Sequence, residues 1–273
     1  MTSLRSTKLR SQISIWMTSA LTTRTRTAMP RRVVAIVAAA GKGKRLGAEL
    51  PKSYVPLRGK ALLVRSVQAM LTSGIVDEVI VIISPEMQDY AERILGQAGL
   101  LPSPEIPVRL VHGGEERADS VWCGLQSLPD KDAVVLIHDS ARALTPPGMI
   151  ARVARAVLEG AEAVIPVLPV ADTIKEVDGT TVLRTPVRSS LRAVQTPQGF
   201  DLAQLRAANL AYFEQQPEFI ATDDASLMEW FGVNVQCVQG DPMAFKVTTP
   251  LDYALAKAVT DEAEPTIFEV PSD

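Results

Sequence analysis

Short apolar runs alternate with amphipathic segments along most of the chain, and this alternation limits the fold more than any other feature. The apolar runs predict strands at residues 33–40, 79–83, 108–111, 133–137 and 163–167. The segments between them predict helices at residues 61–72, 86–96, 120–128 and 147–159. Strands that are apolar on both faces and separated by helices form parallel sheets covered by helices. We therefore expect an α/β fold with a mostly parallel, doubly covered sheet.

The alternation ends at Asp172, where a β-hairpin is predicted. Residues 173–177 and 181–185 flank Asp178-Gly179, a pair typical of two-residue hairpin turns. Three arginines make this segment basic: Arg184, Arg188 and Arg192. We expect a projecting β-arm at about residues 169–195. A lone hairpin is only marginally stable in water, so either another chain covers the arm or it folds onto its own domain.

The last part of the chain is expected to mix helices with short strands. Helical patterns occur at residues 202–213, 226–231 and 251–259, and strand patterns at residues 235–238 and 245–248. The acidic pair Asp223-Asp224 precedes the second of these helices and could serve only as a helix N-terminus.

A glycine-rich turn follows the first predicted strand. Gly41, Gly43 and Gly47 have the spacing G-x-G-x-x-x-G, which fits neither a Walker A loop nor a dinucleotide fingerprint. The glycines allow a ligand to approach the backbone closely, and Arg45 and Lys52 add positive charge nearby. Such a loop can bind a phosphate chain through N–H groups and cations. The alternative is an ordinary strand-to-helix turn with solvated cations.

Two further polar motifs follow predicted strands. The third strand is followed by Gly113, Gly114, Glu115, Arg117 and Ser120, and the fourth by His138, Asp139 and Arg142. Ligands of open α/β sheets bind at the carboxyl ends of the strands, so the three motifs are expected to form one site. Alternatively, the glycines form only a turn, and Asp139 is a helix cap with Arg142 as its ion-pair partner.

These residue types indicate phosphoryl or nucleotidyl transfer. The sequence shows no Ser-His-Asp or Cys-His arrangement, so the substrate is expected to supply the nucleophile. Phosphoryl transfer depends mainly on positioning and charge neutralisation. We expect Mg²⁺ as the cofactor, held mainly through nucleotide phosphates with Asp139 nearby and few protein ligands.

Charge and composition exclude several other classes of protein. A net charge of −3 over 273 residues argues against general nucleic-acid binding. Apolar runs long enough to cross a bilayer are missing from the sequence, so no membrane association is expected. Cys123 and Cys237 have no metal-binding or redox spacing and suit a reducing compartment, the cytoplasm. His112 and His138 are too few for a histidine-based metal site.

The first 28 residues are basic and contain no acidic residue. This segment could be a disordered tail, a transit peptide directing the chain to a plastid, or an extension upstream of a true start at Met29. A secretory signal is disfavoured because no adequate apolar region follows the basic residues. The single folded domain is expected to comprise residues 29–273.

Seven motifs occur in the order found in one known family: AAAGKGKRLG…PKSY, GGEERADSV, HDSAR, DTIK, TPQGF, TDDAS and FKVTTPLD. On these motifs, which run from about Val33 to Leu255, the chain resembles the 2-C-methyl-D-erythritol 4-phosphate cytidylyltransferase family. The resemblance implies a Rossmann-like nucleotidyltransferase fold. It also implies a reaction of the non-mevalonate isoprenoid pathway, in which CTP and methylerythritol phosphate give CDP-methylerythritol and pyrophosphate.

The resemblance implies roles for individual residues. The catalytic residues would be Arg45, Lys52, Arg188 and Lys246, with Arg45 and Lys52 stabilising the transition state. The CTP-binding residues would be Ala39, Ala40, Gly41, Gly43, Gly114, Glu115, Ser120 and Asp139. Methylerythritol phosphate would contact Asp139, Arg142, Thr173, Arg188, Thr196 and Lys246. The β-arm would cross to a partner subunit, so Thr173 and Arg188 would complete the neighbour's site in a homodimer.

The chain departs from the family pattern at three positions. Ser53 stands where Gln is common, Ser140 where Ala is usual, and Ala244 where Asn is expected, with Asp241 as another polar group nearby. Two alternatives remain: a cytidylyltransferase for another polyol phosphate such as ribitol 5-phosphate, or a non-catalytic nucleotide-binding protein. Thr173, Arg188 and Thr196 favour methylerythritol phosphate, and the presence of Arg45 and Lys52 favours catalysis.

Overall fold

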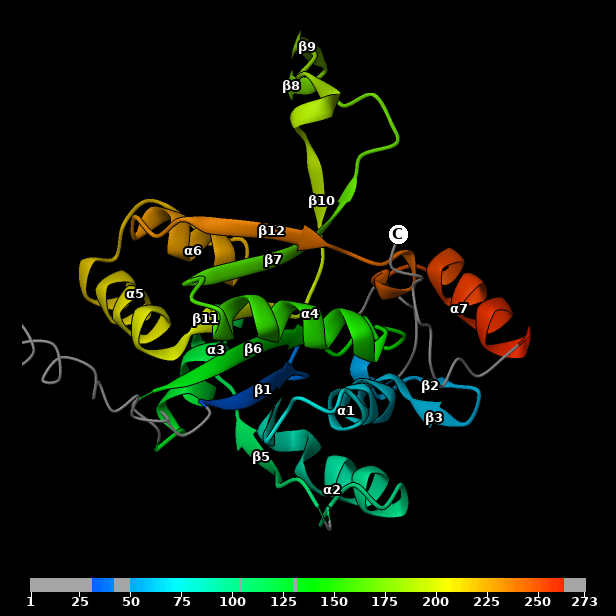
Figure 1. The fold of residues 1–273 in the computed structure, drawn as a ribbon. Helices are drawn as coiled ribbons and strands as arrows, with labels where there is room; N and C mark the ends of the chain where they lie inside the picture. The colour runs from blue at the N-terminus through cyan, green and yellow to red at the C-terminus, as the bar shows by residue number, and fades with distance from the viewer. Residues whose placement is uncertain (1–30, 42–49, 104, 130–131, 263–273) are drawn as a thin grey trace, which may run out of the picture. The chain divides into compact units, whose positions relative to one another are not determined.

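The computed structural model describes residues 31–41, 50–103, 105–129 and 132–262. An eight-stranded sheet forms the centre of this part of the chain (Figure 1). Its strand order is β10-β7-β11-β6-β1-β4-β5, and β12 pairs with β7. The strands are β1 (Arg32–Ala38), β4 (Glu78–Ile83), β5 (Val108–His112), β6 (Ala133–Asp139), β7 (Ala163–Pro169), β10 (Arg192–Val194), β11 (Gln198–Asp201) and β12 (Val235–Gln239).

The predicted parallel pairing is confirmed for the strands that carry the apolar runs. β1 pairs in parallel with β4 and β6, β4 with β5, and β7 with β12. Two strands run against this direction and were not predicted: β11 pairs antiparallel with β6 and β7, and β10 pairs antiparallel with β7.

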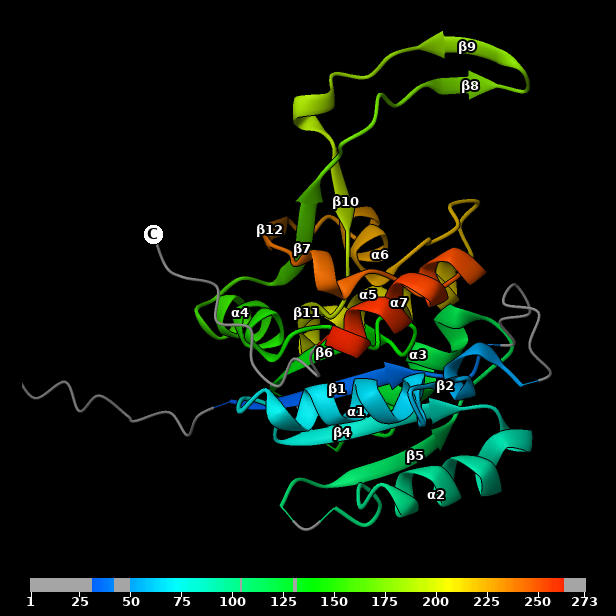
Figure 2. The same ribbon diagram turned by 90° about the vertical axis from the view of Figure 1, so that its right-hand side faces the viewer.

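Helices cover both faces of the sheet, as expected (Figures 1 and 2). They are α1 (Leu62–Thr72), α2 (Gln88–Gln97), α3 (Arg117–Gln126), α4 (Pro147–Leu158), α5 (Leu202–Gln215), α6 (Asp224–Trp230) and α7 (Pro250–Glu262). Alternate residues of β1 point to opposite faces. Ala35 and Val37 pack in the core beneath α1, α2 and α4, whereas Val34 and Ile36 pack in the core beneath α3, α5 and α6.

Short elements connect these layers. They are the 3₁₀ turns η2 (Lys52–Tyr54), η3 (Pro85–Met87), η4 (Arg188–Ser190) and η5 (Pro242–Ala244), and the small hairpin β2 (Pro56–Leu57) and β3 (Lys60–Ala61). Among the helices of the described residues, none combines the length and apolar character needed to cross a membrane.

The predicted β-arm is confirmed as a hairpin. β8 (Glu176–Asp178) and β9 (Thr181–Arg184) pair antiparallel, with Gly179 at positive φ in the turn between them. Figures 1 and 2 show the arm standing away from the sheet beyond β7 and β10. β8 begins later than the predicted strand, so Thr173 precedes it. Large apolar side chains on the arm are exposed, among them Val182, Leu183 and Val187.

The predicted strand at residues 245–248 is wrong. These residues follow η5 in an irregular conformation, with Val247 donating one backbone hydrogen bond to the Ala141 carbonyl. Val247 is buried against Leu57 and Leu62, so its apolar character serves packing rather than a sheet ladder. The side-chain pattern alone does not distinguish these two uses of an apolar residue.

Candidate active site

A pocket of about 470 Å³ lies at the carboxyl ends of β1, β5 and β6. Each of the three predicted motifs contributes residues to its wall. The lining residues are Ala38, Ala40, Gly41, Lys52, Ser53, Gly114, Glu115, Glu116, Arg117, Ser120, Asp139, Ser140, Ala141 and Lys246. The strand-end argument made from the sequence therefore correctly predicts that these motifs meet.

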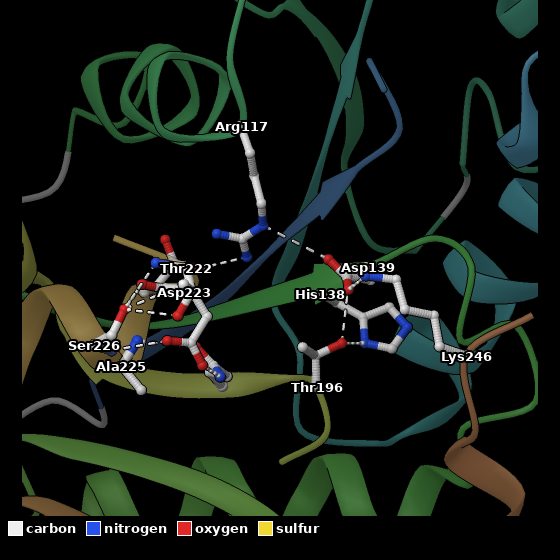
Figure 3. A network of polar contacts seen from close by, with 11 residues as sticks. Arg117, His138, Asp139, Thr196, Thr222, Asp223, Ala225, Ser226 and Lys246 are labelled. Atoms are coloured by element: carbon white, nitrogen blue, oxygen red, sulfur yellow. Dashed lines mark hydrogen bonds and ion pairs between the residues drawn. The ribbon is translucent and has the colours of Figure 1, made fainter. Parts of the chain in front are cut away.

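Asp139 is the carboxylate around which the charges of the pocket are arranged. Its Oδ2 atom lies 2.7 Å from Lys246 Nζ, and its Oδ1 atom lies 3.8 Å from Arg117 Nε (Figure 3). Burial by itself raises the pKa of Asp139, but the charges of Arg117 and Lys246 outweigh burial and lower the pKa to about 2. Asp139 is therefore ionised at neutral pH and holds two cations at the pocket wall.

Arg117 links this carboxylate to a second one on α6. Its Nη2 atom lies 2.6 Å from Oδ2 of Asp224, a side chain that is only 4% exposed. The charge of Asp224 is the largest influence on Arg117 and raises its pKa, so the guanidinium stays protonated. Asp223 instead caps α6 by accepting a hydrogen bond from Ser226 N. The helix-cap interpretation of the acidic pair thus applies to Asp223, whereas Asp224 orients Arg117.

The backbone N–H of Asp139 is held by the connection between β10 and β11. Thr196, which lies between β10 and β11, accepts a hydrogen bond from Asp139 N at 3.0 Å. The same hydroxyl lies 3.1 Å from His138 Nδ1 (Figure 3). Complete burial lowers the pKa of His138 to about 4, so its ring is neutral at physiological pH. Thr196 thus supports Asp139 from beneath and does not line the pocket.

The two glycines after β5 are required by close packing against α3. A Cβ atom on Gly113 would lie 2.6 Å from Ser120 Oγ, and one on Gly114 would lie 2.4 Å from Asp119 Cβ. Neither distance is compatible with an unshifted neighbour. The helix begins at Arg117, three residues before the predicted start, because Glu116 and Asp119 form a capping box. This earlier start places Arg117 and Ser120 at the pocket wall.

Several predicted site residues lie elsewhere or outside the described residues. Ala39 is buried and donates its N–H to the Ile82 carbonyl, while its neighbours Ala40 and Gly41 line the pocket. Gly43 and Arg45 fall within residues 42–49, which lie outside the described part of the chain.

Arg142 has structural partners in this chain. Its guanidinium donates to the carbonyl oxygens of Ala244 (2.8 Å) and Val194 (3.1 Å), which ties the end of β6 to η5 and β10. Ala244 is buried and contributes its backbone carbonyl, so this contact does not depend on the side chain at position 244. Burial lowers the pKa of Arg142.

Thr173 and Arg188 lie on the arm and do not line the pocket of their own chain. Arg188 Nη1 donates to the Ala171 carbonyl at 2.8 Å, and Arg188 borders a separate hollow at the base of the arm. A single chain therefore does not bring these two residues to Asp139 and Lys246.

The pocket also contains wall residues that were not predicted: Ala38, Ser53, Glu116, Ser140 and Ala141. Asp224, which holds Arg117 from outside the wall, was not predicted as a site residue either. Each of them lies within a motif that was identified from the sequence. Arg117 and Asp224 are 107 residues apart in the chain, so only the fold shows that they pair.

Comparison with known proteins agrees with this geometry. A family model described as 2-C-methyl-D-erythritol 4-phosphate cytidylyltransferase (IspD) matches residues 33–262. A Corynebacterium diphtheriae protein with that name is 79% identical over 245 residues, which are 90% of this chain and 100% of the relative. One from Rhodococcus jostii is 51% identical over 231 residues, covering 84% of this chain and 96% of the relative.

Solved structures agree at the level of the fold. The enzyme of the same name from Thermus thermophilus superposes with a TM-score of 0.65 at 34% identity, covering 85% of this chain and all of that one. A 4-diphosphocytidyl-2C-methyl-D-erythritol synthase from Anaerococcus prevotii has a TM-score of 0.73 at 28% identity, covering 85% of this chain and 100% of that one. The chain thus belongs to the 2-C-methyl-D-erythritol 4-phosphate cytidylyltransferase family.

Proposed function

We propose that this protein transfers CMP from CTP to 2-C-methyl-D-erythritol 4-phosphate, giving CDP-methylerythritol and pyrophosphate. The observation that carries the proposal is the pocket in which Asp139 holds Lys246 and Arg117 while Lys52 lines the same wall. Three cationic side chains in one pocket suit a polyphosphate, and family membership identifies the nucleotide and its acceptor.

The chemistry needs no protein nucleophile and no general base. An oxygen of the acceptor phosphate forms a bond to the α-phosphorus of CTP, and the bond from that phosphorus to the oxygen bridging to the β-phosphorus breaks. The attacking oxygen already carries negative charge, so no proton must be removed. The protein needs only to hold the acceptor phosphate in line with the α-phosphorus of CTP and to neutralise the negative charge that develops between them.

We assign the roles accordingly. Lys52, together with Arg45 of the preceding loop, stabilises the pentavalent phosphorus. Lys246, held by Asp139, orients the acceptor phosphate. Ala40, Gly41, Gly114, Glu115 and Ser120 surround the cytosine and ribose at the part of the pocket next to α3. A pocket walled by backbone and small side chains favours a pyrimidine over the larger purines.

Mg²⁺ is part of the proposal as a ligand of the nucleotide. Among the described residues, no group of three His, Cys, Asp or Glu side chains could hold a metal ion. The donors at the pocket fit a cation that is bound mainly by phosphate oxygens, with the ionised Asp139 as the nearby carboxylate. Bound in this way, Mg²⁺ supplies charge neutralisation on the triphosphate.

We also propose a homodimer in which the arm completes the neighbour's pocket. Thr173 and Arg188 lie on the arm, away from the pocket of their own chain, and Val187 on the same arm is 70% exposed. Burying the apolar side chains of the arm against a second copy would stabilise both the hairpin and the dimer. Both cysteines are free, which suits the reducing cytoplasm that we propose as the location.

The experiment measures pyrophosphate release with Mg²⁺, methylerythritol phosphate and each of the four nucleoside triphosphates. We expect release with CTP and little with ATP or GTP. Ribitol 5-phosphate serves as the matched acceptor control and should support little release. No release with CTP, or equal release with CTP and ATP, would refute the proposal. Faster pyrophosphate release with ribitol 5-phosphate than with methylerythritol phosphate would show that the proposed acceptor is wrong, while the proposed use of CTP would be retained.

A further inference from the structure

A pair of buried serine hydroxyls joins the turn that carries Lys52 to the strand end that carries Asp139. Ser53 Oγ lies 2.8 Å from Ser140 Oγ. Ser53 is 5% exposed and Ser140 is 2% exposed, and both line the pocket. A buried hydroxyl without a hydrogen-bond partner is unfavourable, so each serine favours the position in which it meets the other.

Each serine is the immediate chain neighbour of a charged pocket residue. Ser53 follows Lys52 within η2, a turn whose N-terminus has no side-chain cap. Ser140 follows Asp139 at the end of β6. The hydrogen bond between the serines therefore connects the turn that carries Lys52 to the strand end that carries Asp139.

Ser140 is the fixed member of the pair. Its carbonyl accepts a hydrogen bond from Ser66 Oγ of α1 at 2.8 Å, and its N–H donates to the Ala38 carbonyl at the end of β1 at 3.2 Å. Both contacts lie within the sheet and the helix that covers it. The hydroxyl of Ser140 thus offers Ser53 an anchor that belongs to the rigid centre of the fold.

We propose that the Ser53–Ser140 hydrogen bond is a positioning contact that sets Lys52 relative to Asp139 and Lys246. Ser53 belongs to the PKSY motif and Ser140 to the HDSAR motif, so the contact joins two of the motifs identified from the sequence. The inference rests on the proposed function, in which Lys52 acts on the reacting phosphorus. A misplacement of about 1 Å at such a group can cost up to about 100-fold in rate.

The test is a double-mutant cycle of Ser53→Ala, Ser140→Ala and the double variant, with kcat, KM for CTP and melting temperature measured for each. Either single substitution breaks the same bond, so each should lower kcat about 3- to 10-fold with KM for CTP within about twofold. The double variant should be no slower than the slower single variant. Each substitution removes one oxygen and adds no atom, so the packing of the variants is retained.

Two outcomes of this cycle would overturn the inference. Unchanged kcat in all variants would show that Lys52 is set without this bond. A small loss of kcat in each single variant together with a large loss of kcat in the double variant would show that each hydroxyl can donate directly to the ligand in place of the other. A wild-type chain that releases no pyrophosphate would instead refute the proposed function, so the two failures are distinguishable.

Thr145→Val is the matched control. Thr145 is as buried as Ser140, lies in the same connection after β6, and donates its hydroxyl to the Arg142 carbonyl at 2.8 Å. It does not line the pocket. Loss of this hydroxyl should lower the melting temperature and leave kcat within about twofold of the wild type. A fall in kcat equal to that of Ser53→Ala would mean that any buried hydroxyl in this region has the same effect, and the proposal would fail.

Discussion

Replacing Asp139 by Asn removes the negative charge that holds Arg117 and Lys246 together. The two cations lower the pKa of Asp139 from 3.8 to about 2, and its side chain is only 15% exposed. One pKa unit corresponds to about 1.4 kcal/mol, so the ionised carboxylate stabilises the fold by about 2–3 kcal/mol at neutral pH. Because the pKa is lower in the folded state, this contribution is complete above about pH 5 and is lost as the pH falls from about 4 towards 2.

Urea denaturation of the wild type and Asp139→Asn at several pH values between 7 and 3 measures this contribution. The wild type should be more stable by about 2–3 kcal/mol at pH 7, and the difference should narrow below about pH 4. Asp178→Asn, at the exposed turn of the arm, is the control and should change stability by less than about 0.5 kcal/mol. Equal stability of wild type and Asp139→Asn at pH 7, or a difference that stays constant down to pH 3, would refute the reasoning.

Two further predictions concern catalysis and the arm. Lys52→Ala should lower kcat about 100- to 1000-fold, while CTP binding measured by calorimetry is largely retained. The reason is that a charge that acts in the transition state contributes little to ground-state binding. Unchanged turnover would show that Lys52 has no part in the mechanism. Arg188→Ala should also be inactive, and mixing it with Lys52→Ala under conditions that exchange subunits should restore about a quarter of wild-type activity, since half of the dimers then contain one site with both residues. If the arm served its own pocket, mixing would restore nothing.

The sheet could be predicted from the sequence because its central strands are apolar on both faces. The apolar runs in β1, β4 and β6 are buried along their whole length or nearly so, and short runs of this kind are typical of the central strands of a parallel sheet. β11 was missed because its four residues contain a glycine and follow Thr196-Pro197, which reads as a turn. Its place between β6 and β7 depends on long-range pairing, which no local pattern encodes.

The candidate site was predictable in its parts and not in its connections. Strand-end motifs identified the wall residues Gly114, Ser120 and Asp139, since the edge of a parallel sheet gathers such ends. The partner of Asp139 is Lys246, 107 residues later, and it reaches the pocket from an irregular segment that was predicted to be a strand. Which charge meets which carboxylate is decided by side-chain geometry after the chain has folded.

The arm leaves the sheet and returns to it through facing residues. Pro169, the last residue of β7, is paired with Arg192, the first of β10. The intervening residues therefore form a loop insertion in an already closed strand pair, and a tight turn joining the two ends would leave the whole sheet intact. We therefore expect changes in the length or sequence of this insertion to leave the strand pairing of the sheet in place. In the homodimer that we propose, the partner chain rather than the sheet constrains the sequence of the arm, so we expect the arm and the sheet to diverge at different rates.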